Sequence, residues 1–255
     1  MENKLVFAKE IIKEAGAFIK KSLSKTITVE EKSAFDDLVT NIDKQTQDLL
    51  VARIKSAFPT DNILAEENNM VHNIKDGNVW VLDPIDGTVN FIVQQDNFCV
   101  MIAYYEKGQG KFGLIYNVMA DQLFYGGGQF DVYCNDKLLS PYKRRPLDRC
   151  LVGSNAAMYA KNYHGIKGFI DKTLGVRVYG GAGLSMSKVL SGQILAYFSV
   201  IYPWDYAAAS IMGKKLDYQL ETITGELRDY SRRQAVMLVP KDRLEEIRDI
   251  LNSEN

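Results

Sequence analysis

The chain has 255 residues, of which 46% are hydrophobic and 25% charged, a composition typical of one large globular domain or two small ones. Its 31 basic and 32 acidic residues give a net charge of −1, which offers no electrostatic basis for binding a nucleic-acid polymer or an anionic membrane. We expect neither partner. A small phosphorylated substrate stays compatible with this charge, because metal ions can supply positive charge.

Cysteine and histidine usage excludes several classes of site. Cys99, Cys134 and Cys150 are an odd number without C-x-x-C spacing, which argues against a disulfide framework and a zinc ribbon. Free thiols in a reducing cytoplasm are the expectation. The two histidines, His72 and His164, lie far in sequence from other candidate ligands, which argues against a His-ligated zinc enzyme. Charged residues interrupt any N-terminal signal peptide, and we expect a cytoplasmic protein.

The first 60 residues predict two helices. Residues 5–23 carry an apolar stripe at helical spacing, which favours packing on a core over binding at a membrane surface. Residues 37–58 carry a second stripe, which Pro59 closes. The polar residues 30–36 predict a loop. Asp43 falls inside the second predicted helix, where an aspartate is usually just solvated.

The stretch from residue 79 to residue 91 predicts a strand, a turn and a helix. Residues 79–82 are apolar and β-prone, and Pro84 is expected to end the strand because it has no N–H for the ladder. Gly87 permits a sharp turn, and Thr88 stands where a helix N-cap would. Asp83 and Asp86 thus sit three positions apart at a corner, which an ordinary surface turn would also explain.

Oxygen ligands gather at this corner. Two carboxylates and the carbonyl of Ile85, which has no obvious strand partner, are hard ligands suited to Mg²⁺. The N–H groups of Gly87 and Thr88 at a helix start favour a phosphate. The short predicted strand 62–65 also ends in carboxylates, Glu66 and Glu67.

The rest of the chain predicts an antiparallel meander followed by an α/β half. Strands are expected at 98–105, 111–118, 122–125 and 131–133, with a polar connector at 142–149. Strands at 151–153, 176–179, 194–200 and 235–239 then alternate with helices at 165–173, 184–190, 206–215 and 241–251. Asp205 could cap the helix that follows it. Gly180, Gly181 and Ala182 lead into another helix, whose N–H groups could face an anion.

Four segments resemble, in chain order, the motifs of the inositol monophosphatase family of Mg²⁺-dependent, lithium-sensitive phosphatases. The signature is D-P-I-D-G-T-V-N-F at 83–91. It is preceded by D-L-V-T-N-I-D at 37–43 and I-L-A-E-E at 63–67, and followed by W-D-Y-A-A-A at 204–209. Ala65 and Ala209 stand where the family usually has glycine. The resemblance covers nearly the whole chain.

The resemblance implies a layered αβαβα sandwich of the sugar-phosphatase type, of class α+β/α/β, related to fructose-1,6-bisphosphatase. We expect one domain over residues 1–255, with subdomains at 1–145 and 146–255. The resemblance also implies two to three Mg²⁺ ions per chain and a homodimer.

Each metal would have its own ligand set. Glu66, Asp83 and the Ile85 carbonyl would bind the first ion, and Asp83, Asp86 and Asp205 the second. Glu66 would also reach a third, weaker ion.

The remaining site residues follow from the same resemblance. Thr88 and Asp43 would orient and deprotonate the attacking water. Lys32 would belong to a loop that closes over the metals. The phosphate and the alcohol part of the substrate would be held by residues at the helix starts and a strand end: Gly87, Thr88, Gly180, Gly181, Ala182, Ser199 and Asp205.

The substrate stays open at this level. Ser199 aligns with a glutamate that contacts inositol hydroxyls in animal relatives, which weakens the case for inositol. We expect hydrolysis of inositol 1-phosphate, with fructose 1,6-bisphosphate, NADP and 3′-phosphoadenosine 5′-phosphate as alternatives. A non-catalytic metal-binding regulator is the alternative of another class, and the intact Thr88/Asp43 pair argues against it.

Overall fold

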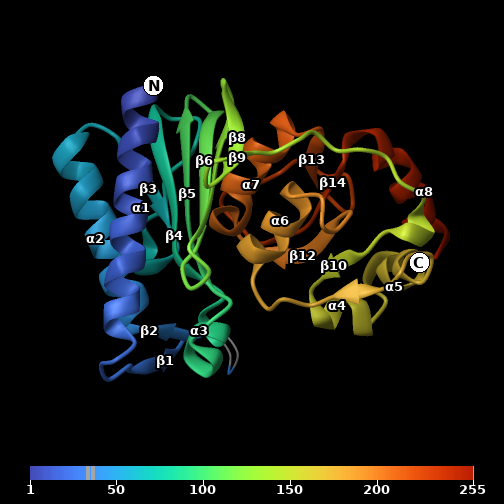
Figure 1. Ribbon diagram of the computed structural model, residues 1–255, viewed down its shortest axis with the longest axis horizontal. Helices are drawn as coiled ribbons and strands as arrows, with labels where there is room; N and C mark the ends of the chain where they lie inside the picture. Colours follow the sequence, from blue (N-terminus) through green and yellow to red (C-terminus); the bar gives the residue numbers. More distant parts are fainter. Residues whose placement is uncertain (33–34, 36–37, 255) are drawn as a thin grey trace.

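Five layers of secondary structure are stacked side by side in the computed structural model (Figure 1). Two long helices cover a seven-stranded sheet, two helices separate it from a five-stranded sheet, and further helices cover the far side of that sheet. The predicted αβαβα sandwich is therefore confirmed. The structure describes residues 1–32, 35 and 38–254, so Asp36 and Asp37, which belong to the predicted loop and second helix, lie outside the described residues.

The outer layer contains α1 (Glu2–Ser22) and α2 (Asn41–Ala57). The apolar stripe of α1 is buried, as its spacing predicts, and includes Ile12 and Ile19. The predicted start of α2 at residue 37 is wrong. The described residues Leu38–Thr40 form β2, which pairs antiparallel with β1 (Val29–Glu31) inside the predicted loop. The side chain of Thr40 then accepts the Ile42 and Asp43 N–H groups and starts the helix.

The seven-stranded sheet has the simple order β3-β4-β5-β6-β7-β8-β9. Only β3 and β4 run parallel, so the predicted antiparallel meander is confirmed for the later strands. The strand bounds are β3 (Asn62–Ala65), β4 (Asn78–Asp86), β5 (Cys99–Glu106), β6 (Gln109–Asn117), β7 (Gln122–Gly127), β8 (Phe130–Cys134) and β9 (Lys137–Leu138).

The five-stranded sheet has the order β11-β10-β12-β14-β13. Strand β10 is parallel to β11 and β12, whereas β14 runs antiparallel to β12 and β13. The sequence pattern missed β13. The bounds are β10 (Val152–Ser154), β11 (Val176–Arg177), β12 (Tyr197–Ile201), β13 (Tyr218–Thr222) and β14 (Gln234–Pro240).

The remaining helices fill the middle and far layers. The middle layer holds α6 (Ala182–Leu190) and α7 (Pro203–Lys215), and the far layer holds α4 (Ala156–Ala160), α5 (Ile166–Ile170) and α8 (Leu244–Ser253). The single helix expected at 165–173 is shorter than predicted. Helix α3 (Thr88–Gln94) follows β4, and the 3-10 turns are η1 (Glu67–Asn69), η2 (Leu147–Arg149), η3 (Tyr163–Gly165) and η4 (Lys241–Arg243).

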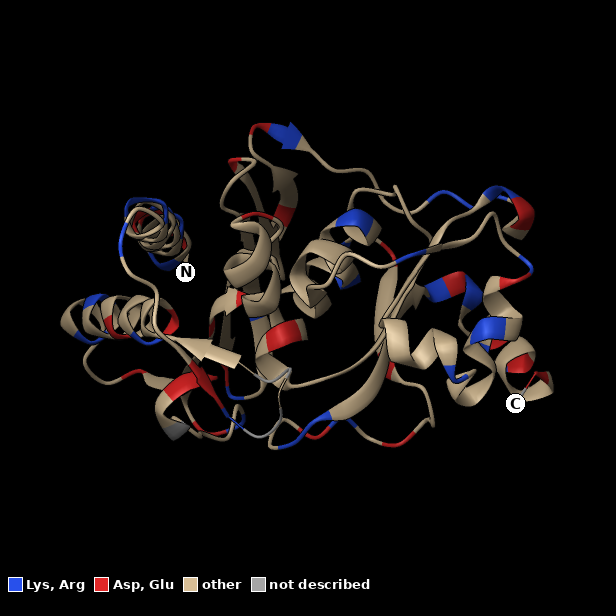
Figure 2. Cartoon of the chain, turned by 90° about the horizontal axis from the view of Figure 1, so that it is seen from below, with Lys and Arg blue, Asp and Glu red and all other residues tan. Residues whose placement is uncertain are grey.

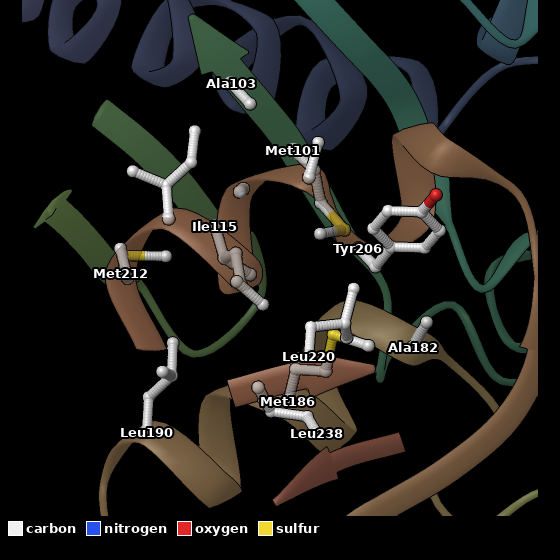
Figure 3. Packing of buried hydrophobic residues seen from close by; sticks show 14 of the residues in the cluster. Met101, Ala103, Ile115, Ala182, Met186, Leu190, Tyr206, Met212, Leu220 and Leu238 are labelled. Atoms are coloured by element: carbon white, nitrogen blue, oxygen red, sulfur yellow. The ribbon is translucent and has the colours of Figure 1, made fainter. Parts of the chain in front are cut away.

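Side chains of β4 and β5 alternate between two cores, as the period of two in a strand requires. Trp80 and Tyr104 belong to the core under α1 and α2, whereas Val81 and Met101 face α6 and α7. Figure 3 shows this second core, where Met101 and Ile115 of the first sheet pack near Met186 of α6 and Met212 of α7. The interleaved packing fixes the start of α7 and the end of β4 relative to each other.

Charged residues of both signs are interspersed over the outer helices and loops (Figure 2). Within the described residues, no helix has the length and apolar character needed to cross a membrane. The three cysteines form no disulfide, as expected from their number and spacing.

Candidate active site

The end of β4 forms the corner on which the site is built. Asp83 pairs with Met101 and Asp86 with Cys99, so three steps along β4 match two along β5. This bulge accommodates Pro84, and the strand continues to Asp86 instead of ending at the proline. Gly87 takes a left-handed conformation with φ 88° and caps α3, so Thr88 is the first helical residue and not the predicted N-cap.

Three aspartates meet at this corner. Asp83 and Asp86 come from β4 and Asp205 from α7, and one carboxylate oxygen of each lies within 4.8 Å of the others. Asp83 is fully buried, and neither of its carboxylate oxygens has a hydrogen-bond partner among the described residues. Burial, reinforced by the neighbouring carboxylates, raises the pKa of Asp83 well above its ordinary value. Buried polar groups are normally paired, so this orphaned carboxylate fits a divalent cation.

Asp86 ties the corner to α6. Its two carboxylate oxygens accept the N–H groups of Ala182 and Gly183, each at 2.9 Å, and the Cys99 thiol donates to it at 3.4 Å. A Cβ on Gly181 would lie 2.8 Å from Asp86 Oδ2, so glycine allows this close approach. The start of α6 therefore binds a protein carboxylate, and the Ala182 N–H does not point into open space as the sequence suggested.

Asp205 is the third residue of α7 and not its N-cap. Its Oδ2 accepts the Tyr202 N–H at 2.7 Å, in the manner of a capping box. Burial, followed by the charges of Glu66 and Asp86, raises the pKa of Asp205 well above its ordinary value. The start of α7 thus places the Asp205 carboxylate close to those of Asp83 and Asp86.

Besides burial, the charge of Glu66 raises the pKa of Asp83 and of Asp205, but Glu66 itself is paired with a cation of the chain. Lys32 Nζ contacts Glu66 Oε1 at 2.8 Å and Glu67 Oε1 at 2.6 Å. Burial raises the pKa of Glu66 to about 7, although Lys32 opposes that shift. Glu67 is further held by Gln47, which exchanges hydrogen bonds with its main chain at 2.6 and 2.8 Å. Lys32 therefore pairs with Glu66 and Glu67, and its place in a loop that closes over the metals stays a prediction.

Thr88 and Asp43 are in contact. Thr88 Oγ1 lies 3.1 Å from both Asp43 Oδ1 and the carbonyl oxygen of Ile85. Asp43 is the third residue of α2, and its other oxygen accepts the main-chain N–H and the hydroxyl of Thr40. Burial raises the pKa of Asp43 to about 6, despite these hydrogen bonds. The residue that looked like a solvated mid-helix aspartate is buried at a helix start.

One pocket of about 260 Å³ collects the remaining predicted residues. Asn90 of α3 donates to the carbonyl of Tyr179 at 2.8 Å and so holds the loop before α6 against the corner. The predicted residues that line the pocket are Asp86, Gly180, Gly181, Ala182, Ser199 and Asp205. The sequence reasoning gave no role to Asn90 or to Arg233, which also lines this pocket.

The family model of the inositol monophosphatase family matches residues 1–252. The chain belongs to this family. Its members are phosphatases that act on small phosphorylated substrates, and the chain is accordingly a phosphoric monoester hydrolase. Family members depend on Mg²⁺, which agrees with the acidic cluster found here.

Named relatives span most of the chain. Inositol-1-monophosphatase of Bacillus subtilis is 38% identical over 226 residues, covering 86% of this chain and 85% of its own. The fructose-1,6-bisphosphatase/inositol-1-monophosphatase of Thermotoga maritima is 29% identical, with 88% and 86% covered. The Nus factor SuhB of Escherichia coli is 28% identical, with 88% and 87% covered.

Solved structures share the whole fold. Inositol monophosphatase II of Staphylococcus aureus superposes with a TM-score of 0.88 at 30% identity, covering 99% of this chain and 94% of its own. An inositol monophosphatase/NADP phosphatase solved with Mg²⁺ and phosphate gives a TM-score of 0.89 at 26% identity, with 98% and 95% covered.

Proposed function

We propose that this chain is a Mg²⁺-dependent phosphomonoesterase for a small phosphorylated alcohol, with inositol 1-phosphate as the first candidate substrate. The observation that carries the proposal is Asp83, a fully buried carboxylate without a partner beside Asp86 and Asp205. Three carboxylates at this separation repel one another, and divalent cations would remove that repulsion. The 38% identical relative bears the name inositol-1-monophosphatase.

The donors suit two ions. Glu66, Asp83 and the Ile85 carbonyl would hold one ion, and Asp83, Asp86 and Asp205 would hold the other. Glu66 is also our candidate for a third ion, which would have to displace Lys32 from its carboxylate. Bound Mg²⁺ supplies positive charge that stabilises the charge developing on a phosphoryl group.

The Thr88 hydroxyl has one proton and two acceptors at equal distance, so it donates to one of them at a time. When the proton points to Asp43, the lone pairs of Oγ1 are free to accept a hydrogen bond from a water molecule. Asp43, held by Thr40, keeps the hydroxyl in that orientation. The pair can thus position a water for attack on phosphorus and take up its proton. Gly87 and Thr88, at the start of α3, are our candidates to bind the phosphate through their N–H groups.

The substrate's alcohol would occupy the 260 Å³ pocket beside Gly180, Gly181 and Ala182. Ser199 lies in the same pocket and is 2% exposed, so it offers a short neutral contact. The alternative substrates are fructose 1,6-bisphosphate, NADP and 3′-phosphoadenosine 5′-phosphate. Lithium sensitivity, the homodimer, the cytoplasmic location and the absence of nucleic-acid binding stay predictions.

The test is phosphate release from inositol 1-phosphate and the three alternatives, each with Mg²⁺ and with EDTA. We expect turnover that requires Mg²⁺ and is lost in EDTA. Turnover that is best on inositol 1-phosphate would support the first candidate. Turnover that is best on another substrate would keep the proposed reaction and change only the assigned substrate. No turnover on any substrate would contradict the phosphatase and favour a binding protein, as the name of the SuhB relative suggests for that protein.

A further inference from the structure

Arg233 is the only Lys or Arg among the described residues that line the 260 Å³ pocket. It directly precedes β14, whose first residue, Gln234, pairs with Ile201 of β12. The chain from Ile201 leads through Tyr202 to Asp205 at the start of α7. The strand pairing therefore fixes the backbone of Arg233 near the segment that carries Asp205.

The guanidinium of Arg233 is oriented by one hydrogen bond and one ring. Its Nε donates to the carbonyl of Val200 at 2.9 Å, and its Cζ lies 5.9 Å from the centroid of the Tyr202 ring. Tyr202 in turn stacks on Trp204 at 4.7 Å with an interplanar angle of 11°. Within the described chain these contacts use one of the five N–H donors of the guanidinium, so the two terminal nitrogens have donors available for another partner.

The neighbouring Arg232 differs from Arg233 in both its ion pairs and its position. Its side chain forms ion pairs with Glu226 at 2.9 Å and Asp229 at 3.1 Å, and it does not line the pocket. Arg233 has no carboxylate of the described chain within 4.0 Å. One arginine of the pair is thus neutralised on the surface, and the other presents an uncompensated charge to the pocket.

Besides Arg233, the pocket wall carries two acidic residues and several neutral polar groups. Asp86 and Asp205 belong to the metal cluster, which in the proposed function binds the phosphate to be hydrolysed. The other polar groups of the pocket wall, such as Ser199, Ser154 and Asn155, are neutral. A neutral polyol could accept hydrogen bonds from a guanidinium, but an anionic group would gain both the hydrogen bonds and the charge pairing.

We propose that Arg233 forms a second-anion subsite, which binds a phosphate or carboxylate that the substrate carries in addition to the phosphate that is hydrolysed. The inference rests on the proposed function, because the metal cluster defines where the first phosphate lies. The free edge of a guanidinium matches the two oxygens of such a group in a bidentate contact. Such a subsite would favour the alternative substrates that carry a second anionic group, such as fructose 1,6-bisphosphate, over inositol 1-phosphate.

The experiment uses two substrates that differ only in the second anion, fructose 1,6-bisphosphate and fructose 1-phosphate, with Arg233→Gln and the control Arg232→Gln. Loss of a charged hydrogen-bonded contact should raise KM for the bisphosphate about 10- to 100-fold in Arg233→Gln, with kcat unchanged. KM for fructose 1-phosphate should stay within about twofold. Arg232→Gln should leave both values unchanged, and Arg233→Lys should restore part of the bisphosphate affinity, because it keeps the charge but not the bidentate geometry.

Equal KM changes for both substrates would assign Arg233 a purely structural role through Val200 and would overturn the subsite, as would no change at all. Calorimetric binding of the same two substrates, with Ca²⁺ in place of Mg²⁺, provides a readout independent of turnover. A wild-type protein without turnover whose bisphosphate binding still depends on Arg233 would contradict the proposed function and leave the subsite standing. Binding that does not depend on Arg233 would remove the subsite alone.

Discussion

Two buried aspartates at opposite ends of β4 have opposite surroundings. Asp61, beside the start of the strand, is 2% exposed and accepts hydrogen bonds from Lys4, Asn78 and Trp80. Burial alone would raise the pKa of Asp61, but these donors lower it below its ordinary value. Asp83, at the far end, is fully buried with no donor and a raised pKa.

This difference indicates that the charge of Asp61 serves the structure, whereas the charge of Asp83 serves the function. The Asp61 carboxylate is compensated within the chain, since Lys4 reaches it and also donates to Tyr104 at 2.6 Å. A buried pair of this kind is stable as it stands. The Asp83 carboxylate is compensated by nothing in the described chain, so the fold keeps an electrostatic cost there that only an added cation can remove.

Asp83→Asn should produce the largest effect on activity. The variant removes the charge shared by both proposed metal sets, and we expect kcat to fall about 10³- to 10⁴-fold. Phosphate release at saturating Mg²⁺ measures it. Asp61→Asn is the matched control at the other end of the strand, and its kcat should stay within about twofold of wild type. Retained Mg²⁺-dependent turnover in Asp83→Asn would remove Asp83 from the site.

Asp61→Asn, and not Asp83→Asn, should have the larger effect on the stability of the protein. Asp61→Asn leaves Lys4 without its buried partner and should cost about 3 kcal/mol of unfolding free energy, or about 6–12 °C in Tm. Asp83→Asn should not destabilise the metal-free protein, because it removes an uncompensated charge. Thermal unfolding in EDTA compares them. A metal-free Asp83→Asn protein that melts below Asp61→Asn would contradict the distinction.

Asp43 is intermediate between the two, since it is buried with partners and still has a pKa of about 6. Thr88→Val removes one of those partners and the proposed water contact at nearly constant volume. We expect kcat to fall about 100-fold with little change in KM. Thr46→Val is the control, because the buried Thr46 hydroxyl has no hydrogen-bond partner in the part of the chain that the structure describes. If both variants lost activity equally, Thr88 would have no specific role.

A further prediction concerns how the stability of the metal-free protein depends on pH. Folding raises the pKa of Asp43 from 3.8 to about 6 and that of Glu66 from 4.5 to about 7. The folded state therefore binds more protons than the unfolded state in this range, so stability is greatest at low pH and is lost as pH rises from about 4 to about 7.

We expect each of the two groups to contribute a loss of about 1–3 kcal/mol between pH 5 and pH 8 in EDTA. Saturating Mg²⁺ should flatten this dependence, because ligated carboxylates stay ionised at both pH values. Thermal unfolding at the two pH values, with and without Mg²⁺, measures it. A metal-free Tm that rises with pH over this interval would reverse the assigned sign.

The sequence predicted the parts of the site that are local in the chain. Turn and strand chemistry placed Asp83, Asp86 and Gly87 at a corner, and the order of the motifs predicted the layered fold. The predicted roles of Thr88 and Asp205 as N-caps failed by one and three positions, because propensity places a helix start only approximately. The neighbouring Gly87 and Tyr202 take the cap position instead.

Contacts between distant segments could not be predicted from the sequence. The burial of Asp43 depends on Thr40 and on Thr88, 45 positions away. The pocket position of Arg233 depends on the register of β12 and β14, and the identical residue beside it does not line the pocket. The sequence does not show that Asp61 is paired with a lysine and that Asp83 is not. Tertiary packing decides which carboxylate receives a partner.

The most direct test of the unpaired carboxylates is a Mg²⁺ titration of thermal unfolding in protein first stripped with EDTA. We predict that Mg²⁺ at about 100 times its Kd raises the wild-type Tm by about 5–10 °C, equivalent to about 2.7 kcal/mol. Asp83→Asn should lose most of this rise, and Asp61→Asn should keep it from a lower starting Tm. A wild-type Tm that does not respond to Mg²⁺, or an equal rise in Asp83→Asn, would contradict the account.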